Sequence, residues 1–85
     1  MKLRYSSKCK KQYKKLPIKT RKQFINRVDL FLKNPQNSIL GIHRLSGPLQ
    51  DSWSINITGD IRAIFDKYDD SVLFISIGSH SKLYS

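Results

Sequence analysis

Several residue types that enzymes and metal sites commonly use are scarce or missing in this chain of 85 residues. All six acidic residues are aspartates, so there is no glutamate, and the sequence has one cysteine, Cys9, and two histidines. One cysteine cannot form an intrachain disulfide and gives too few ligands for a cysteine-based zinc site. Any acid-base chemistry would therefore depend on His, Asp, Tyr or Lys.

Long hydrophobic runs are also absent. No apolar run approaches the roughly 18 residues of a membrane helix, and the N-terminus lacks the apolar central region of a secretory signal. We therefore expect a soluble, cytoplasmic protein of one domain, residues 1–85, with no membrane partner. A glycine-rich phosphate loop, a histidine pair at helical spacing and a carboxylate cluster are missing too, which predicts no metal and no small-molecule cofactor.

Negative charge is scarce in the first part of the chain. Sixteen Lys and Arg against six acids give a net charge of +10. Residues 1–35 contain twelve of these bases and a single acid, for a charge of +11, whereas residues 36–85 carry −1. Charged helices usually mix signs, so this imbalance favours contact with a polyanion over a merely solvated surface. Nucleic acid or an acidic protein is the expected partner.

The apolar pattern predicts an α+β fold in which two N-terminal helices, a helical hairpin, pack on a small antiparallel β-sheet. Residues 1–5 could form a short edge strand. Apolar residues spaced by three and four predict a helix from residue 7, capped by Ser6 or Ser7, then a break at Pro17 and a second, roughly antiparallel helix that ends at Asn34 and Pro35.

Alternation replaces helical spacing in the second half and predicts three strands, over residues 53–57, 61–68 and 72–77, with Trp53 in the core. The last of these strands is almost wholly apolar, which indicates a central position in the sheet. Gly59 and Asp60 predict a tight hairpin turn with a positive φ at Gly59, and residues 69–71 predict the next turn.

Residues capable of chemistry are few in this half of the chain. They are His43, Arg44, Arg62, His80, Lys82 and Tyr84. By strand parity Arg62 shares a face with Ile64, where a guanidinium suits a bidentate contact to phosphate as well as it suits the solvent side of a sheet. Each of the two histidines and Tyr84, taken alone, fits a surface or structural role better than a catalytic one.

Four stretches together resemble the RelE/ParE superfamily of small basic toxins from type II toxin–antitoxin modules, and most nearly its YafQ-like branch. They are residues 43–47, 53–57, 59–65 and 77–84. The most specific is the ending, residues 78–84, which matches the YafQ-like terminus of Gly, Ser or Thr, His, two further residues, Leu, and Phe or Tyr. The resemblance covers nearly the whole chain, and the family's two helices followed by a sheet agree with the pattern above.

The resemblance implies ribosome-dependent cleavage of messenger RNA by a toxin that a cognate antitoxin protein neutralises. His80 and Tyr84 match active-site positions of the terminal motif. His43 stands where a histidine recurs shortly before the Leu-x-Gly of the sheet, and Arg62 stands where RelE- and YoeB-like enzymes use an arginine.

A protein that cleaves RNA need not supply a nucleophile, because the 2′-hydroxyl of the RNA serves as one. One group removes its proton, another protonates the leaving 5′-oxygen, and a cation stabilises the phosphorane, without a metal. His43 and His80 could share the proton transfers, with Arg62 as the cation and Tyr84 stacked on a base. The remaining contacts are expected with flanking phosphates and ribosomal RNA, through Lys82, Arg44, Lys10, Lys11, Lys14 and Lys15.

Two positions depart from the YafQ-like pattern. Asn56 stands where many members have a further histidine, and Ser54 where they have an acid; an amide cannot act as a general base. Two other functions therefore stay open: a ParE-like inhibitor that binds DNA gyrase, and a catalytically silent paralogue that binds RNA or antitoxin. His80 and Tyr84 favour the ribonuclease, because a pure binding module has no evident use for them.

Overall fold

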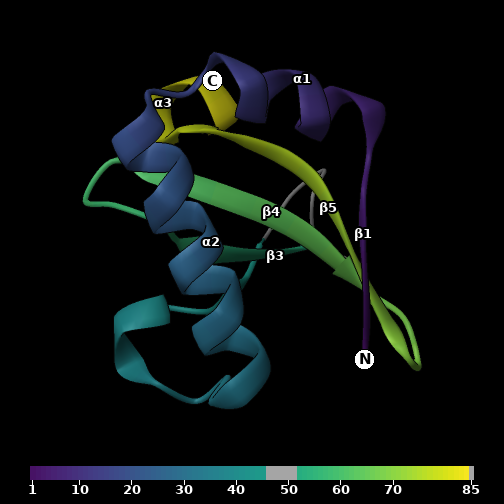
Figure 1. The fold of residues 1–85 in the computed structure, drawn as a ribbon. Coiled ribbons are helices and arrows are strands. Elements are labelled where there is room, and N and C mark those ends of the chain that lie inside the picture. The colour runs from purple at the N-terminus through teal and green to yellow at the C-terminus, as the bar shows by residue number, and fades with distance from the viewer. Residues whose placement is uncertain (46–51, 85) are drawn as a thin grey trace.

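The computed structural model describes residues 1–45 and 52–84 and has the predicted α+β architecture. In Figure 1, α2 lies in front of the sheet, whereas α1 and α3 lie at its upper end. None of the described helices is long and apolar enough to cross a membrane. The elements are β1 (Lys2–Tyr5), α1 (Ser7–Lys15), α2 (Ile18–Lys33), the 3-10 helix η1 (Ser38–Leu40), β2 (His43–Arg44), β3 (Trp53–Asn56), β4 (Ile61–Lys67), β5 (Ser71–Ser79) and α3 (His80–Tyr84).

The sheet has five strands in the order β1-β5-β4-β3-β2. The edge strand at the N-terminus and the central position of β5 are confirmed. The sheet is mixed, however, because β1 pairs parallel to β5, while β2, β3, β4 and β5 pair antiparallel in succession. The two-residue strand β2 was not predicted, and it forms the second edge.

Beyond the end of β1, residues of α1 and its cap form the hydrogen bonds to the edge of β5. The last residue of β1 is opposite Phe74, and beyond it the Ser6 hydroxyl donates to the carbonyl of Ile75 at 2.9 Å. The Gln12 side-chain oxygen then accepts from the backbone N–H of Ile77 at 2.7 Å and from the Ser76 hydroxyl at 3.2 Å. These contacts satisfy edge groups that would otherwise be open to another strand, and they fix α1 beside the end of β5.

Pro17 separates the two helices, as predicted. Leu16 and Pro17 have extended backbone conformations, with ψ of 147° and 151°, so the chain changes direction before α2 begins. In Figure 1, α1 crosses the top of the molecule and α2 descends from its end, so the helices diverge and do not form the predicted antiparallel hairpin. Ser6 caps α1, and α2 ends immediately before Asn34, both as predicted.

The core lies between α2 and the sheet and is rich in aromatic rings. Phe31 of α2 packs on Phe65 with ring centroids 5.2 Å apart, and Phe24 packs on Phe74 at 5.7 Å. Trp53 is only half-buried at the margin of this core, with the Lys67 ammonium 3.9 Å from its ring centroid. Its expected position inside the core is therefore wrong, because β3 has only the short strand β2 outside it.

The turn between β3 and β4 differs from the prediction. Gly59 has no positive φ; Gly41 is the residue that adopts one among those described. The Thr58 hydroxyl holds the turn instead, because its oxygen accepts from the backbone N–H groups of Asp60 and Ile61 at 3.2 and 3.0 Å. Side-chain hydrogen bonds of this kind stabilise turns without requiring glycine geometry.

Burial controls the reactivity of Cys9. This residue lies on the buried face of α1 and is 1% exposed, and burial raises the pKa of its thiol to about 11. With this pKa only about one thiol in a thousand is ionised at pH 8, and the thiolate is the form that reacts. We expect no labelling of the folded protein by iodoacetamide at pH 8, and complete labelling in denaturant, measured by mass spectrometry. Rapid labelling of the folded protein would contradict this placement of Cys9.

Candidate functional site

Strand register brings two of the predicted catalytic residues to one face of the sheet. Asn56 is opposite Arg62, which is opposite Gly78. His43 is opposite Ser54, two residues before Asn56, and residues two apart in a strand share a face. The face that carries His43, Asn56, Arg62 and Gly78 is called the site face below, and it lies on the side of the sheet away from α2.

Arg62 and His80 are both attached to the turn between β3 and β4. Nη1 of Arg62 donates to the carbonyls of Thr58 at 2.9 Å and Gly59 at 3.1 Å. The backbone N–H of His80 donates to the carbonyl of Asp60 at 3.1 Å. The turn therefore holds the guanidinium and the start of α3 near each other, with the imidazole exposed.

The contacts of Arg62 leave one edge of its guanidinium suited to an anion. The bonds to the turn all involve Nη1. Bidentate binding of a phosphate or carboxylate uses two N–H groups side by side, which Nε and Nη2 provide on the opposite edge. Arg62 thus holds the turn through Nη1 and presents Nε and Nη2 as a candidate binding edge for an anion.

His43 is held in one tautomer by a backbone carbonyl. Its Nδ1 lies 3.0 Å from the oxygen of Gly41, and since a carbonyl can only accept, Nδ1 carries the proton. In the neutral ring Nε2 is then the unprotonated nitrogen, as a general base requires. Flat-sheet spacing puts the Cα atoms of His43 and Arg62 roughly 12 Å apart, so Arg62 lies between His43 and His80 across the site face.

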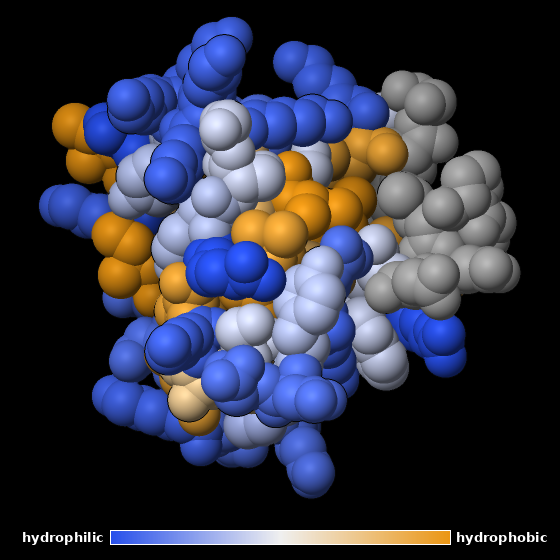
Figure 2. Space-filling model, turned by 90° about the vertical axis from the view of Figure 1, so that its right-hand side faces the viewer, coloured by the Kyte–Doolittle hydropathy of each residue, from blue (hydrophilic) through white to orange (hydrophobic). Residues whose placement is uncertain are grey.

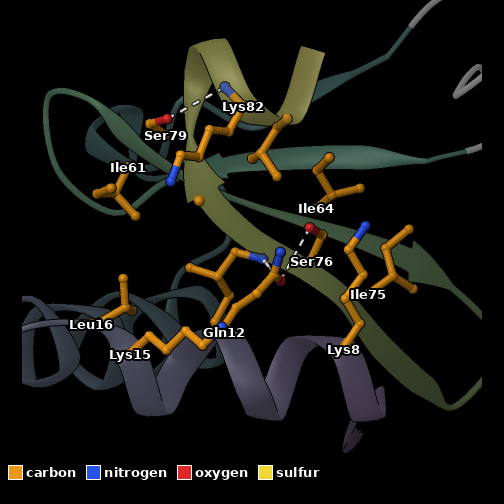
Figure 3. A pocket seen from close by; sticks show the side chains of 13 residues that line it. Lys8, Gln12, Lys15, Leu16, Ile61, Ile64, Ile75, Ser76, Ser79 and Lys82 are labelled. Carbon is orange, nitrogen blue, oxygen red and sulfur yellow. Dashed lines mark hydrogen bonds between the residues drawn. The ribbon is translucent and has the colours of Figure 1, made fainter. Parts of the chain in front are cut away.

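A groove of about 740 Å³ adjoins the site face between α1, β5 and α3 (Figure 3). Leu83 of α3 packs over Gly78, where an added Cβ would lie 3.4 Å from the leucine side chain. The groove lining includes Lys82 of α3 and Lys15 of α1, two residues predicted to contact RNA. This groove extends the site face toward the first helix.

Solved structures match the chain over almost its full length, although no family model and no curated protein matches it. A YafQ variant from E. coli aligns with a TM-score of 0.81 at 19% identity, covering 98% of this chain and 97% of that one. YafQ in the E. coli DinJ-YafQ toxin-antitoxin complex aligns at 0.71 and 20% identity, covering 98% and 96%. A YoeB/ParE toxin from Agrobacterium tumefaciens aligns at 0.77 and 16% identity, covering 94% and 99%. This chain has the YafQ-like toxin fold.

The comparisons confirm the fold that the resemblance of the four sequence stretches implied. The match includes the helices, the mixed sheet and the C-terminal segment that contains His80. Within the part of the chain that the structure describes, no three His, Cys, Asp or Glu side chains lie close enough together to hold a metal ion.

The other predicted contact residues are spread over the YafQ-like fold. Lys10 and Lys14 line a separate apolar pocket of about 390 Å³ between α1 and α2, and Lys11 is exposed on α1. Arg44 is opposite Trp53, so it belongs to the sheet face opposite the site face. The side chain of Tyr84 lies outside the described part of the chain. Figure 2 shows how hydrophilic side chains surround exposed apolar ones on one side of the molecule.

Sequence reasoning missed two residues that shape this region. Gly41 has a φ of 52° and provides the carbonyl that orients His43; a two-residue strand after a 3-10 helix leaves no periodic signal for it. Gln12 ties α1 to β5, and its only signal was that it is a neutral residue among the lysines of the first helix.

Replacement of Gly41 tests how closely the candidate site depends on this backbone. Alanine there would adopt a left-handed conformation, and its Cβ would collide with the side-chain amide nitrogen of Asn56. We expect Gly41→Ala to lower the free energy of unfolding by about 2 kcal/mol. Gly59→Ala is the matched control, since its Cβ would meet nothing within 4 Å, and chemical denaturation should find a change within about 0.5 kcal/mol. Equal effects of the two substitutions would contradict this account of Gly41.

Proposed function

We propose that this protein is the toxin of a type II toxin–antitoxin pair and that it cleaves messenger RNA on the ribosome through attack by the 2′-hydroxyl. The YafQ-like fold supports the toxin role. The observation that supports cleavage is that one turn holds both the Arg62 guanidinium and the backbone of His80, while Arg62 shares the site face with the oriented imidazole of His43.

Each residue has one step in the proposed reaction. His43 Nε2 takes the proton of the 2′-hydroxyl, and the 2′-oxygen forms a bond to phosphorus while the bond from phosphorus to the 5′-oxygen breaks. His80 gives a proton to that leaving oxygen, and Arg62 stabilises the negative charge of the phosphorane. The products are a 2′,3′-cyclic phosphate and a 5′-hydroxyl. The protein itself supplies every proton transfer that this scheme needs.

The charge distribution supports ribosomal RNA and an acidic antitoxin as partners. Residues 1–35 carry +11, and lysines that contact phosphates give strong binding without sequence readout. The same field would attract an acidic antitoxin segment. E. coli YafQ is found in a toxin-antitoxin complex with DinJ, and we propose that this chain also has a cognate antitoxin.

Two alternatives make different demands on the site face. A gyrase inhibitor would need a protein-binding surface, and a His43 ring oriented by the Gly41 carbonyl would have no evident role in it. A silent paralogue is favoured by Asn56, because its amide stands on the site face where it cannot transfer a proton. The tautomer of His43 and the anchored Arg62 favour catalysis over both alternatives.

Toeprinting of a translated message separates the three functions. The native protein should cut the message only within the ribosomal A site, and His80→Ala should remove nearly all of these cuts while Trp53→Phe retains them. Intact message together with blocked supercoiling by gyrase would replace the proposal with the gyrase inhibitor. Ribosome or antitoxin binding without any cut would replace it with the silent paralogue.

A further inference from the structure

The groove between α1 and α3 has a cationic rim and an apolar floor. Figure 3 shows Lys8 and Lys15 on the α1 side and Lys82 on the α3 side. Lys8 and Lys15 are seven residues apart, so they lie on the same side of the helix and about 10 Å apart along its axis. None of the described residues that line the groove is acidic. Three positive charges around one hollow favour an anionic occupant.

Gln12 adds a fixed polar group to the wall of the groove. Its side-chain oxygen accepts from the N–H of Ile77 and from the hydroxyl of Ser76, which fixes the orientation of the amide. The amide nitrogen is a donor on the same group, and Figure 3 shows Gln12 reaching from α1 to β5 within the groove. A donor set of this kind recognises phosphate oxygens. The apolar floor, with Ile64 and Ile75, suits the faces of ribose and bases.

The groove is continuous with the site face. Ile61 and Gly78 line it, and they are the neighbours of Arg62 along and across the sheet. Ser79 also lines it and directly precedes His80. A nucleic-acid strand with one phosphate at Arg62 would therefore meet this groove next. The lysines on the other side of α1, Lys10 and Lys14, face a different pocket and do not extend the site face.

We infer that this groove binds the phosphodiester backbone of the single-stranded RNA next to the cleavage point, with Lys8, Lys15 and Lys82 at its phosphates. The inference rests on the proposed function, which makes single-stranded messenger RNA the substrate, and it adds the path of that RNA strand across the protein. An acidic peptide could match the same charges, but continuity with Arg62 and His80 favours the RNA strand itself.

Two triple variants of equal charge test this path. Lys8→Gln, Lys15→Gln and Lys82→Gln together remove the rim of the groove, whereas Lys2→Gln, Lys19→Gln and Lys22→Gln remove three exposed lysines outside it. The probe is a fluorescent single-stranded oligoribonucleotide with 2′-O-methyl groups, which block cleavage. Anisotropy across a salt series measures its affinity, and circular dichroism verifies the fold of each variant.

The groove variant should lose affinity and lower the slope of log affinity against log salt by about 2, as expected for three phosphate contacts on a single strand. The outside variant should lower it by less than half as much. Equal losses in both variants, or unchanged binding in the groove variant, would overturn the path. The path would also be overturned if the groove lysines were needed to bind an acidic polyglutamate peptide but not to bind the RNA probe.

Failure of the path and failure of the proposed function give different results. The probe cannot be cut and no ribosome is present, so the anisotropy measurement does not depend on cleavage. If the native protein cuts translated messages while both triple variants bind the probe alike, the path is overturned and the ribonuclease stands. If no message is cut but only the groove variant loses binding, the path stands and the proposed reaction is overturned.

Discussion

His80→Ala is expected to lower the rate of message cleavage by about 100-fold or more, because general acid catalysis commonly contributes that much. The cost to folding should stay within about 1 kcal/mol, since the imidazole is exposed and the backbone N–H that bonds Asp60 remains. Quantitative toeprinting measures the rate, and chemical denaturation measures the free energy of unfolding.

The matched control is Ser81→Ala, which changes an exposed neighbour in α3 and should leave the cleavage rate within about twofold of native. The variant His80→Gln retains a polar side chain that cannot transfer a proton, so it should be as inactive as His80→Ala. Cleavage at the native rate by either His80 variant would remove this residue from the proposed reaction.

Arg62→Ala is expected to reduce both cleavage and stability. Loss of the cation at the phosphorane should lower the rate by about 100- to 1000-fold, the range found when a single oxyanion donor is removed. Loss of the Nη1 bonds to the carbonyls of Thr58 and Gly59 should lower the free energy of unfolding by about 1 to 2 kcal/mol, discounted for the partial exposure of the side chain. The rate is measured by toeprinting and the stability by denaturation.

Two controls separate these effects. Phe31→Leu removes part of the core beneath α2, far from the site face, and should cost a similar free energy of unfolding while it leaves cleavage intact. Arg62→Lys retains one charge but lacks the planar edge for bidentate binding, so its activity should stay well below native. Full activity of Arg62→Lys would show that a point charge is enough and would contradict the bidentate contact.

Local sequence signals were sufficient for the elements that depend on neighbouring residues. Pro17 lacks a backbone donor and cannot continue α1, and the Ser6 hydroxyl accepts from the backbone N–H of Cys9 in the first turn of α1. The apolar run in β5 indicated its central position. These features follow from short-range sterics and hydrogen bonding, so they could be predicted without knowledge of the rest of the fold.

Features that depend on distant partners could not be predicted in the same way. The parallel pairing of β1 with β5 joins residues about seventy positions apart, and nothing in residues 1–5 specifies that partner. The direction of α2 after Pro17 is likewise set by packing of Phe24 and Phe31 on the sheet.

The candidate site shows the same division. Strand parity placed Arg62 on a face with Ile64, but the turn carbonyls that hold its Nη1 follow from the conformation of residues 58–60. The motif at the C-terminus identified His80, whereas its attachment to Asp60 required the register of β4 and β5. Gly41 had no sequence signal, and its carbonyl sets the tautomer of His43.

The central claim is that the site face receives a ribonucleotide and uses its 2′-hydroxyl as the nucleophile. The most direct measurement is toeprinting of a translated message that carries a single 2′-deoxy nucleotide at the cleavage position, beside the same message with a ribonucleotide there. We predict complete loss of cleavage at the deoxy position, with ribosome binding unchanged. Cleavage of both messages at equal rates would contradict the claim.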